Sequence, residues 1–175
     1  MLFRSGYEIL YCTEYVDEFT IMTLRKYKDF EFKNVCNDSI DLDTKEEKEE
    51  LAKKNDEAKD MFKTMAEAVS EVKSIRFTNK LKNHPVCLSS DGEISVEMEK
   101  AMNAMPFDND VKASKVLEIN ENHPIAKKLE NLYNTDKEEL KNMTKVLYAQ
   151  ARLIEGLSIE NPTEISNLIC EYLSK

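Results

Sequence analysis

The residues that could do chemistry in this sequence are few, and their spacing fits no common catalytic motif. The two histidines, His84 and His123, each precede a proline, which is typical of a turn or a helix start, and no H-E-x-x-H zinc pattern is present. His84 lies three residues before Cys87, so a Cys–His nucleophile pair is the enzymatic alternative. Cys87 stands between Val86 and Leu88 on a predicted strand, which favours a structural thiol.

Phosphate binding and metal binding are equally poorly supported. The sequence contains three glycines, Gly6, Gly92 and Gly156, and their spacing matches neither the G-x-x-x-x-G-K nor the G-x-G-x-x-G phosphate-binding motif. No C-x-x-C pair occurs among the four cysteines, which are Cys12, Cys36, Cys87 and Cys170. Because each lies among apolar residues, we predict reduced, mostly buried thiols. We therefore predict no catalytic residue, no metal site and no cofactor in this chain.

The composition indicates a soluble, helix-rich globular protein of 175 residues, 41% hydrophobic and 34% charged. A net charge of −9 excludes phosphate backbones and anionic lipids as natural partners, because both repel an acidic chain. No run of 18 or more apolar residues is present, and Met1–Gly6 is too short and weakly apolar for a secretory signal. We expect a cytoplasmic protein that binds neither nucleic acid nor membrane.

Two structural units are predicted in the first 72 residues. The apolar run Tyr7–Thr13 predicts a buried strand, followed by a helix to about Tyr27 and a short strand at Phe32–Cys36. A single long helix is then predicted from a capping box at Thr44 and Glu47. Its apolar face is formed by Leu51, Ala58, Phe62, Met65, Val69 and Val72.

The next segment is predicted to mix short strands with one helix. Antiparallel strands with one solvent-facing side are indicated by three alternating pairs: Ile75 and Phe77, Val86 and Leu88, and Leu117 and Ile119. A helix from about Glu93 to Met105 is predicted between Asp91-Gly92 and Pro106.

The last third is predicted to be helical. One helix begins at Pro124, a second is capped by Asp136 and ended by Gly156, and a third begins at Asn161-Pro162.

Methionines form a stripe on the helix predicted before Pro106. Met98, Met102 and Met105 are spaced i, i+4 and i+7, and Phe107 follows. Because methionine is flexible and polarizable, such a stripe can contact varied partners, but it can equally face the core. The residues alone favour the core.

The last two helices are more apolar than one packing partner requires. Their apolar faces contain Leu140, Met143, Leu147, Ile154, Leu157, Ile165, Leu168, Ile169, Tyr172 and Leu173, with Val146 and Leu153 widening the first face. Pairing with a second copy would give a four-helix bundle about a two-fold axis, whereas packing on the preceding sheet would cover the same residues within the chain. The residues alone leave both alternatives open.

Four segments resemble the heat-shock protein 90 family. Ser95–Met102 is similar to its S-x-x-M-E-x-x-M helix, and Lys115–Ile125 resembles its K-x-L-E-I-N-x-x-H-P-I segment. Leu157–Pro162 resembles the L-E-D-P motif before its last helix, and Gly6–Phe19 is similar to the G-Y-E-V-L and I-D-E region late in its middle domain. The four occur in the family's order, and the absence of an acidic tail after Leu173 resembles the bacterial type.

The resemblance implies an α+β fold in three parts. These are the end of a middle domain at 1–42, a connecting helix at 43–72 and a dimerisation domain at 73–175, with a short antiparallel sheet and a C-terminal helical hairpin. It also implies a homodimer held through helices at about 137–155 and 162–174. The methionine stripe would contact unfolded or partly folded client proteins.

The resemblance also limits what the chain does by itself. The family's ATPase domain lies upstream of the matched segments, so ATP and Mg²⁺ are implied only for full-length members. Our hypothesis is a chaperone part that dimerises and contacts clients, without enzyme activity. The alternative is a structural dimerisation or adaptor module that binds no client.

Overall fold

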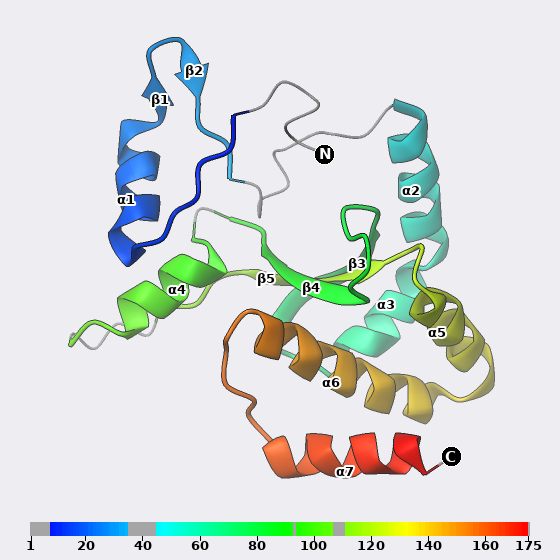
Figure 1. Ribbon diagram of the computed structural model, residues 1–175. Coiled ribbons are helices and arrows are strands. Elements are labelled where there is room, and N and C mark those ends of the chain that lie inside the picture. Colours follow the sequence, from blue (N-terminus) through cyan, green and yellow to red (C-terminus); the bar gives the residue numbers. More distant parts are fainter. Residues whose placement is uncertain (1–7, 35–44, 93, 107–110, 175) are drawn as a thin grey trace.

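The computed structural model describes residues 8–34, 45–92, 94–106 and 111–174, and Figure 1 shows them as a mixed α+β fold. The helices in this part of the chain are Tyr15–Leu24 (α1), Lys45–Glu57 (α2), Lys59–Ala66 (α3), Val96–Asn103 (α4), Pro124–Thr135 (α5), Lys137–Ile154 (α6) and Pro162–Leu173 (α7). The strands are Lys26–Tyr27 (β1), Phe30–Glu31 (β2), Val72–Thr78 (β3), Val86–Ser90 (β4) and Lys115–Asn120 (β5). The predicted α+β class is therefore confirmed, while the division into three domains stays a prediction.

The main sheet has the order β3-β5-β4, and its strand directions differ from the prediction. β4 pairs antiparallel with β5, but β3 pairs parallel with β5, with Phe77 opposite Ile119. The prediction of an antiparallel sheet with one wet side is thus wrong for the β3–β5 pair. β5 is buried along its whole length because it lies between two strands. Alternation of apolar residues predicts a strand but does not encode its direction.

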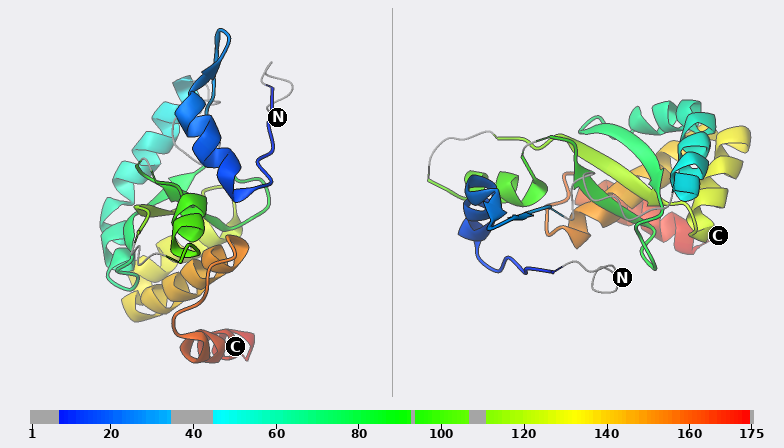
Figure 2. Two further views of the ribbon diagram at one scale, coloured as in Figure 1. Left: turned by 90° about the vertical axis from the view of Figure 1, so that its left-hand side faces the viewer. Right: turned by 90° about the horizontal axis from the view of Figure 1, so that it is seen from above.

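The core lies between one face of this sheet and the helices α3, α5 and α6, which Figures 1 and 2 show on the same side. The sheet contributes Val72, Ile75, Phe77, Val86, Leu88, Leu117 and Ile119. The helices contribute Met61, Phe62, Met65, Ala126, Leu129, Leu140, Met143, Leu147, Tyr148 and Ala151. The rings of Phe62 and Phe77 meet edge to face at 5.0 Å between centroids. Since each large apolar side chain contributes about 1.5–3 kcal/mol when fully buried, this core accounts for most of the stabilising free energy.

The N-terminal segment departs from its prediction. Residues 8–13 form no strand, and Leu10 and Tyr11 are 57% and 80% exposed, so the predicted buried strand at Tyr7–Thr13 is wrong where it is described. α1 ends at Leu24, with Arg25 as its C-cap, and the chain then forms the two-residue pair β1–β2. An apolar run becomes a strand only where another strand bonds to it. The strand predicted at Phe32–Cys36 is also wrong where it is described, because residues 32–34 form no strand and β2 ends at Glu31. Tyr7, Val35 and Cys36 lie outside the described residues.

The long helix predicted before β3 is two helices. α2 ends at Glu57, α3 begins at Lys59, and α3 ends before the turn that leads into β3. Ala58 leaves helical geometry, with φ −85° and ψ 1°. The two helices have different environments, because α2 buries no residue whereas α3 buries Met61, Phe62 and Met65. The break therefore lets α3 pack on the sheet at an angle that a continuous helix could not take. Thr44 of the predicted capping box lies outside the described residues.

The last helices begin and end close to where local signals predicted. The His123 side chain accepts a hydrogen bond from the Ile125 amide at the start of α5, 3.2 Å away. Asp136 accepts one from the Glu139 amide at 3.0 Å and so caps α6, and Gly156 takes a left-handed φ of 68° just after α6. The predicted start of α7 at Pro162 is confirmed, but its N-cap residue Asn161 makes no side-chain capping bond.

Candidate functional site

α6 contacts the sheet and contributes most of its apolar face to the core. Leu140, Met143 and Leu147 are 0%, 6% and 4% exposed and lie in the main core cluster. These three residues were predicted to form a dimer surface. Within this chain they are already covered by their intrachain neighbours, so a partner could contact them only if the chain rearranged.

The outer side of the α6–α7 pair remains open. Figures 1 and 2 show α7 as the outermost layer, on the side of α6 away from the sheet. Of its predicted dimer residues, Leu168 is buried and Ile165 and Tyr172 are half-buried, as is Leu157 in the connection. The side chains of Leu153, Ile154, Ile169 and Leu173 are 61%, 48%, 41% and 83% exposed. We call these four residues the outer apolar face.

Few contacts attach α7 to the rest of the molecule. Leu168 is its one buried residue among those described, and Tyr172 packs against the edge of the core. Lys145 of α6 bonds to Glu164 at 2.6 Å, but both side chains are about a third or more exposed. Exposed pairs of this kind contribute at most about 1 kcal/mol, so they do not by themselves fix the helix.

α4 begins one residue after Ser95, whose hydroxyl accepts a hydrogen bond from the Met98 amide at 3.0 Å. The helix is shorter than the predicted 93–105. Its methionines run from the interior to the surface: Met98 is buried at 8% exposure, Met102 is half-buried and Met105 is 46% exposed. Phe107, the fourth predicted client-contact residue, lies outside the described residues.

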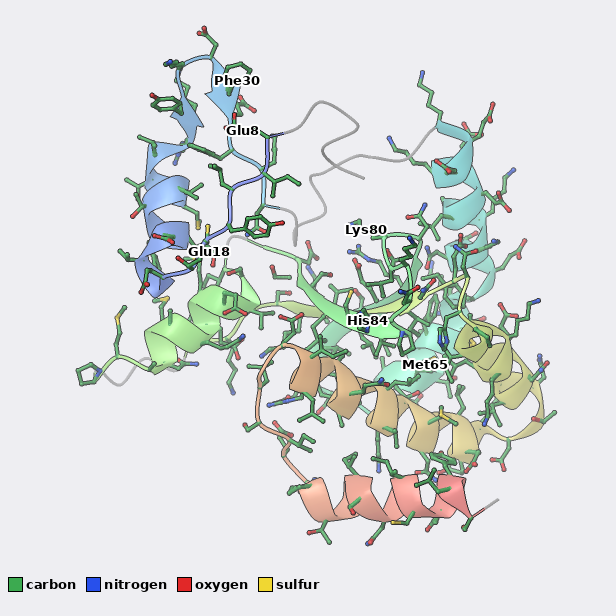
Figure 3. The ribbon with its side chains drawn as sticks, in the orientation of Figure 1. Glu8, Glu18, Phe30, Met65, Lys80 and His84 are labelled. Atoms are coloured by element: carbon green, nitrogen blue, oxygen red, sulfur yellow. The ribbon has the colours of Figure 1, made fainter. Side chains whose placement is uncertain are left out.

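Several contacts hold α4 in place, and three of them reach α1, β5 and the end of α6. At its start, the Ser95 hydroxyl donates to the Glu18 carboxylate of α1 at 2.8 Å, and Figure 3 shows Glu18 directed towards α4. Along its length, Glu99 pairs with Lys115 of β5 at 2.6 Å, with only 12% and 8% of the two side chains exposed. Near its end, Lys100 donates to the main-chain oxygen of Glu155 at the end of α6. Since breaking a buried ion pair leaves an uncompensated charge, the Glu99–Lys115 contact strongly restricts movement of α4.

The Cys87 thiol is not activated as a nucleophile. The Cys87 thiol lies 3.8 Å from the Glu118 carboxylate, and burial, followed by the charge of Glu118, raises the pKa of Cys87 to about 12. A thiol with so high a pKa is a poor nucleophile at neutral pH. The expectation of mostly buried cysteines is wrong for Cys12 and Cys170, which are exposed, because their helix or loop presents them to solvent.

Two polar clusters were not found by sequence reasoning. Glu118, 2% exposed on the central strand, accepts hydrogen bonds from Arg76 and from the Ser89 hydroxyl. A carboxylate inside the apolar run of β5 was the available signal for this cluster. The second cluster is formed by Arg152 and Glu71. These residues are so far apart in the sequence that no local pattern predicts their contact.

Comparison with known proteins places this arrangement in a family. A sequence model described as "Hsp90 protein" matches residues 1–175. The chain belongs to the Hsp90 family.

Named relatives within the Hsp90 family are bacterial chaperones. The chain is 46% identical to the "Chaperone protein HtpG" of Bacillus subtilis (strain 168) over 174 residues, which cover 99% of this chain and 28% of that protein. It is 47% identical to the protein of the same name from Clostridium perfringens (strain 13 / Type A), covering 99% of this chain and 27% of that relative. The chain thus spans little more than a quarter of the length of these relatives, and its membership of the Hsp90/HtpG chaperone family is shown.

The ATP that the Hsp90 family implies does not fit the residues described here. One open hollow among them, of about 500 Å³, is lined by Phe19, Thr20, Thr23 and Leu24 of α1. Another, of about 250 Å³, lies between α2 and β3. Neither has the glycine-rich backbone that cradles phosphates. No helix in the described ranges is long and apolar enough to cross a membrane.

Proposed function

We propose that this chain provides homodimerisation and client contact within an Hsp90-type chaperone, and that it carries no catalytic residue of its own. A stable pairing of two copies raises the effective concentration of whatever is attached to each, so that two arms can close on one client. In this proposal ATP and Mg²⁺ act in parts of the full-length chaperone outside the chain. A cytoplasmic location and the absence of nucleic-acid and membrane partners remain predictions.

One observation carries the dimer proposal, namely the outer apolar face on α6 and α7. Leu173 and Ile169 lie one turn apart in the C-terminal half of α7, and Leu153 and Ile154 are exposed at the other end of the helical pair, where α6 ends. Exposing several large aliphatic side chains on one helical pair costs free energy that a second copy can offset. A two-fold pairing of two such helical pairs gives a four-helix arrangement.

The dimer proposal is tested by molar mass across a dilution series. Replacing the two exposed residues of α7, as Ile169→Glu with Leu173→Glu, should raise the dimer Kd by at least about 100-fold, because the charges would be buried without partners. The matched control is Asn167→Glu with Ser174→Glu, which adds the same charge at an exposed position on another side of α7 and at its exposed C-cap. A folded monomer in the parent chain at micromolar concentration, or an equal loss in both variants, would refute the dimer proposal.

Client contact is proposed for the exposed end of the α4 methionine stripe. Met102 is half-buried and Met105 is 46% exposed, and flexible thioethers suit contact with varied apolar sequences. The burial of Met98 favours the alternative, a structural module, for the inner end of the stripe. Phe107 stays a prediction.

The two alternatives are separated by the ability to hold an aggregating client, measured by light scattering. Met102→Asp with Met105→Asp should lower this ability about fivefold while the circular dichroism spectrum and the dimer stay unchanged. Ala104→Asp with Pro106→Asp, two exposed positions just after α4, is the control. Unchanged holding by the methionine variant would favour the structural module.

A further inference from the structure

The connection between α6 and α7 is a tight corner rather than a loose loop. The Gly156 amide bonds to the Leu153 oxygen at 3.0 Å, and the Leu157 amide bonds to the Arg152 oxygen at 2.8 Å. This pair of bonds is the Schellman ending, in which the left-handed φ of Gly156 turns the chain away from the helix axis. Residues 155–161 then lead directly into α7.

The side chain of Arg152 binds this corner to the rest of the molecule. Its Nε donates to the Ser158 main-chain oxygen at 2.7 Å, and its guanidinium lies 3.4 Å from the Glu160 carboxylate. It also pairs with Glu71, in the turn before β3, and lies over the ring of Tyr148 at 5.5 Å. Only 11% of the Arg152 side chain is exposed. One residue therefore connects α6, the start of the main sheet and the corner.

Two carboxylates converge on this single cation. The Tyr148 hydroxyl donates to Glu71 at 2.9 Å. The hydrogen bond between Glu71 and Glu160 lowers the pKa of Glu71 and raises that of Glu160. Because a guanidinium stays charged at all physiological pH values, Arg152 holds the two carboxylates together permanently. When both carboxyl groups are ionised, Glu71 and Glu160 repel each other, and the Arg152 guanidinium offsets that repulsion.

We propose that Arg152 is a positioning residue that fixes the direction of α7, and so aligns the outer apolar face for a second copy. This inference rests on the proposed dimer function. α7 has 12 residues and is about 18 Å long, so a tilt of roughly 20° at the corner would move Leu173 by on the order of 6 Å. Such a displacement exceeds what a packed interface tolerates.

Arg152→Ala in the full chain tests the proposal, with the dimer Kd from sedimentation, the melting temperature and hydrogen exchange as measurements. We expect the Kd to rise at least about 10-fold and exchange to speed up at residues 155–161, while the melting temperature of the core changes by only a few degrees. A residue with a merely structural role would lower the melting temperature without this local exchange.

Two further variants make the result specific. Lys145→Ala removes the exposed ion pair with Glu164 that joins the same two helices away from the corner, and it should change the Kd by less than about threefold. Arg152→Lys keeps the positive charge and the fold but lacks the planar guanidinium with its several N–H donors. Its dimer Kd should therefore stay above that of the parent chain. Full dimerisation of Arg152→Lys, or equal effects of Arg152→Ala and Lys145→Ala, would overturn the proposal.

The outcomes separate this inference from the dimer proposal. A monomeric parent chain overturns the dimer and with it the alignment of two copies. If the parent dimerises and Arg152→Ala leaves both the Kd and the exchange at 155–161 unchanged, the dimer stands and the positioning role is overturned.

Discussion

α6 and α7 have similar apolar patterns but opposite environments. α6 buries seven residues, among them Leu140, Met143 and Leu147, whereas α7 buries only Leu168. The two helices are neighbours, yet α6 lies against the sheet and α7 lies outside it (Figure 1). An apolar stripe therefore indicates that a helix has a face to cover, but it does not identify what covers that face.

The same contrast occurs within α4. Its inner methionine, Met98, faces the interior, while Met105 at its end is open to solvent. Met98 and Met102 share one side of α4, whereas Met105 follows the last helical residue, Asn103, so the predicted stripe ends where the helix ends. Position relative to the sheet, and not residue type, separates core from surface here.

The largest expected effect is the difference in stability between two variants, one with a leucine of α6 truncated and one with a leucine of α7 truncated. Leu147→Ala on α6 should lower the free energy of unfolding by about 2–5 kcal/mol, because it leaves a cavity beneath the sheet. Leu173→Ala on α7 should change it by less than about 0.5 kcal/mol at concentrations where the chain is monomeric, because this side chain is 83% exposed. Urea unfolding measures both values. Similar losses in the two variants would contradict the assignment of α6 to the core and α7 to the surface.

A second contrast compares cysteines on the exposed helix and in the sheet. Cys170 of α7 is exposed, whereas the pKa of Cys87 is raised to about 12. At pH 8 the thiolate fraction of Cys87 should be on the order of 1000-fold smaller than that of a thiol with the ordinary pKa of 9.0. Alkylation by iodoacetamide, followed by peptide mass spectrometry, should therefore modify Cys170 long before Cys87. Equal rates would mean that β4 opens freely.

The smallest effect concerns Glu155, at the end of α6. Burial raises the pKa of Glu155, against the opposing charge of Lys100 and assisted by Glu97. A raised folded-state pKa contributes stability at low pH that is lost as the pH rises through it. Glu155→Gln should therefore melt at a higher temperature than the parent at pH 7, and the difference should shrink as the pH falls to 4. A difference that grows on acidification would show that the attraction of Lys100 dominates.

Helix boundaries in the last third were predictable because their causes are local. Asp136, Gly156 and Pro162 act on backbone groups within a few residues, so their effects can be derived from spacing alone. The strands around Phe77, Leu88 and Ile119 were also found, because period-two alternation is a property of the chain itself.

Features that depend on distant segments were missed. The break at Ala58 follows from α3 packing on the sheet, and the exposure of residues 8–13 follows from the lack of a bonded strand beside them in the described structure. Contacts such as Glu71 with Arg152 and Glu18 with Ser95 join residues 81 and 77 positions apart. No spacing rule connects positions so far apart.

The sequence by itself determined the α+β class, the helix ends of the last third, the places of three strands and, through its motifs, the resemblance to the Hsp90 family. Only the tertiary structure decided that β3 runs parallel to β5, that α6 is core and that the outer apolar face is left open. The physical reason is that propensity and capping act over one or two turns. Burial and strand direction, by contrast, are set by which distant surfaces meet.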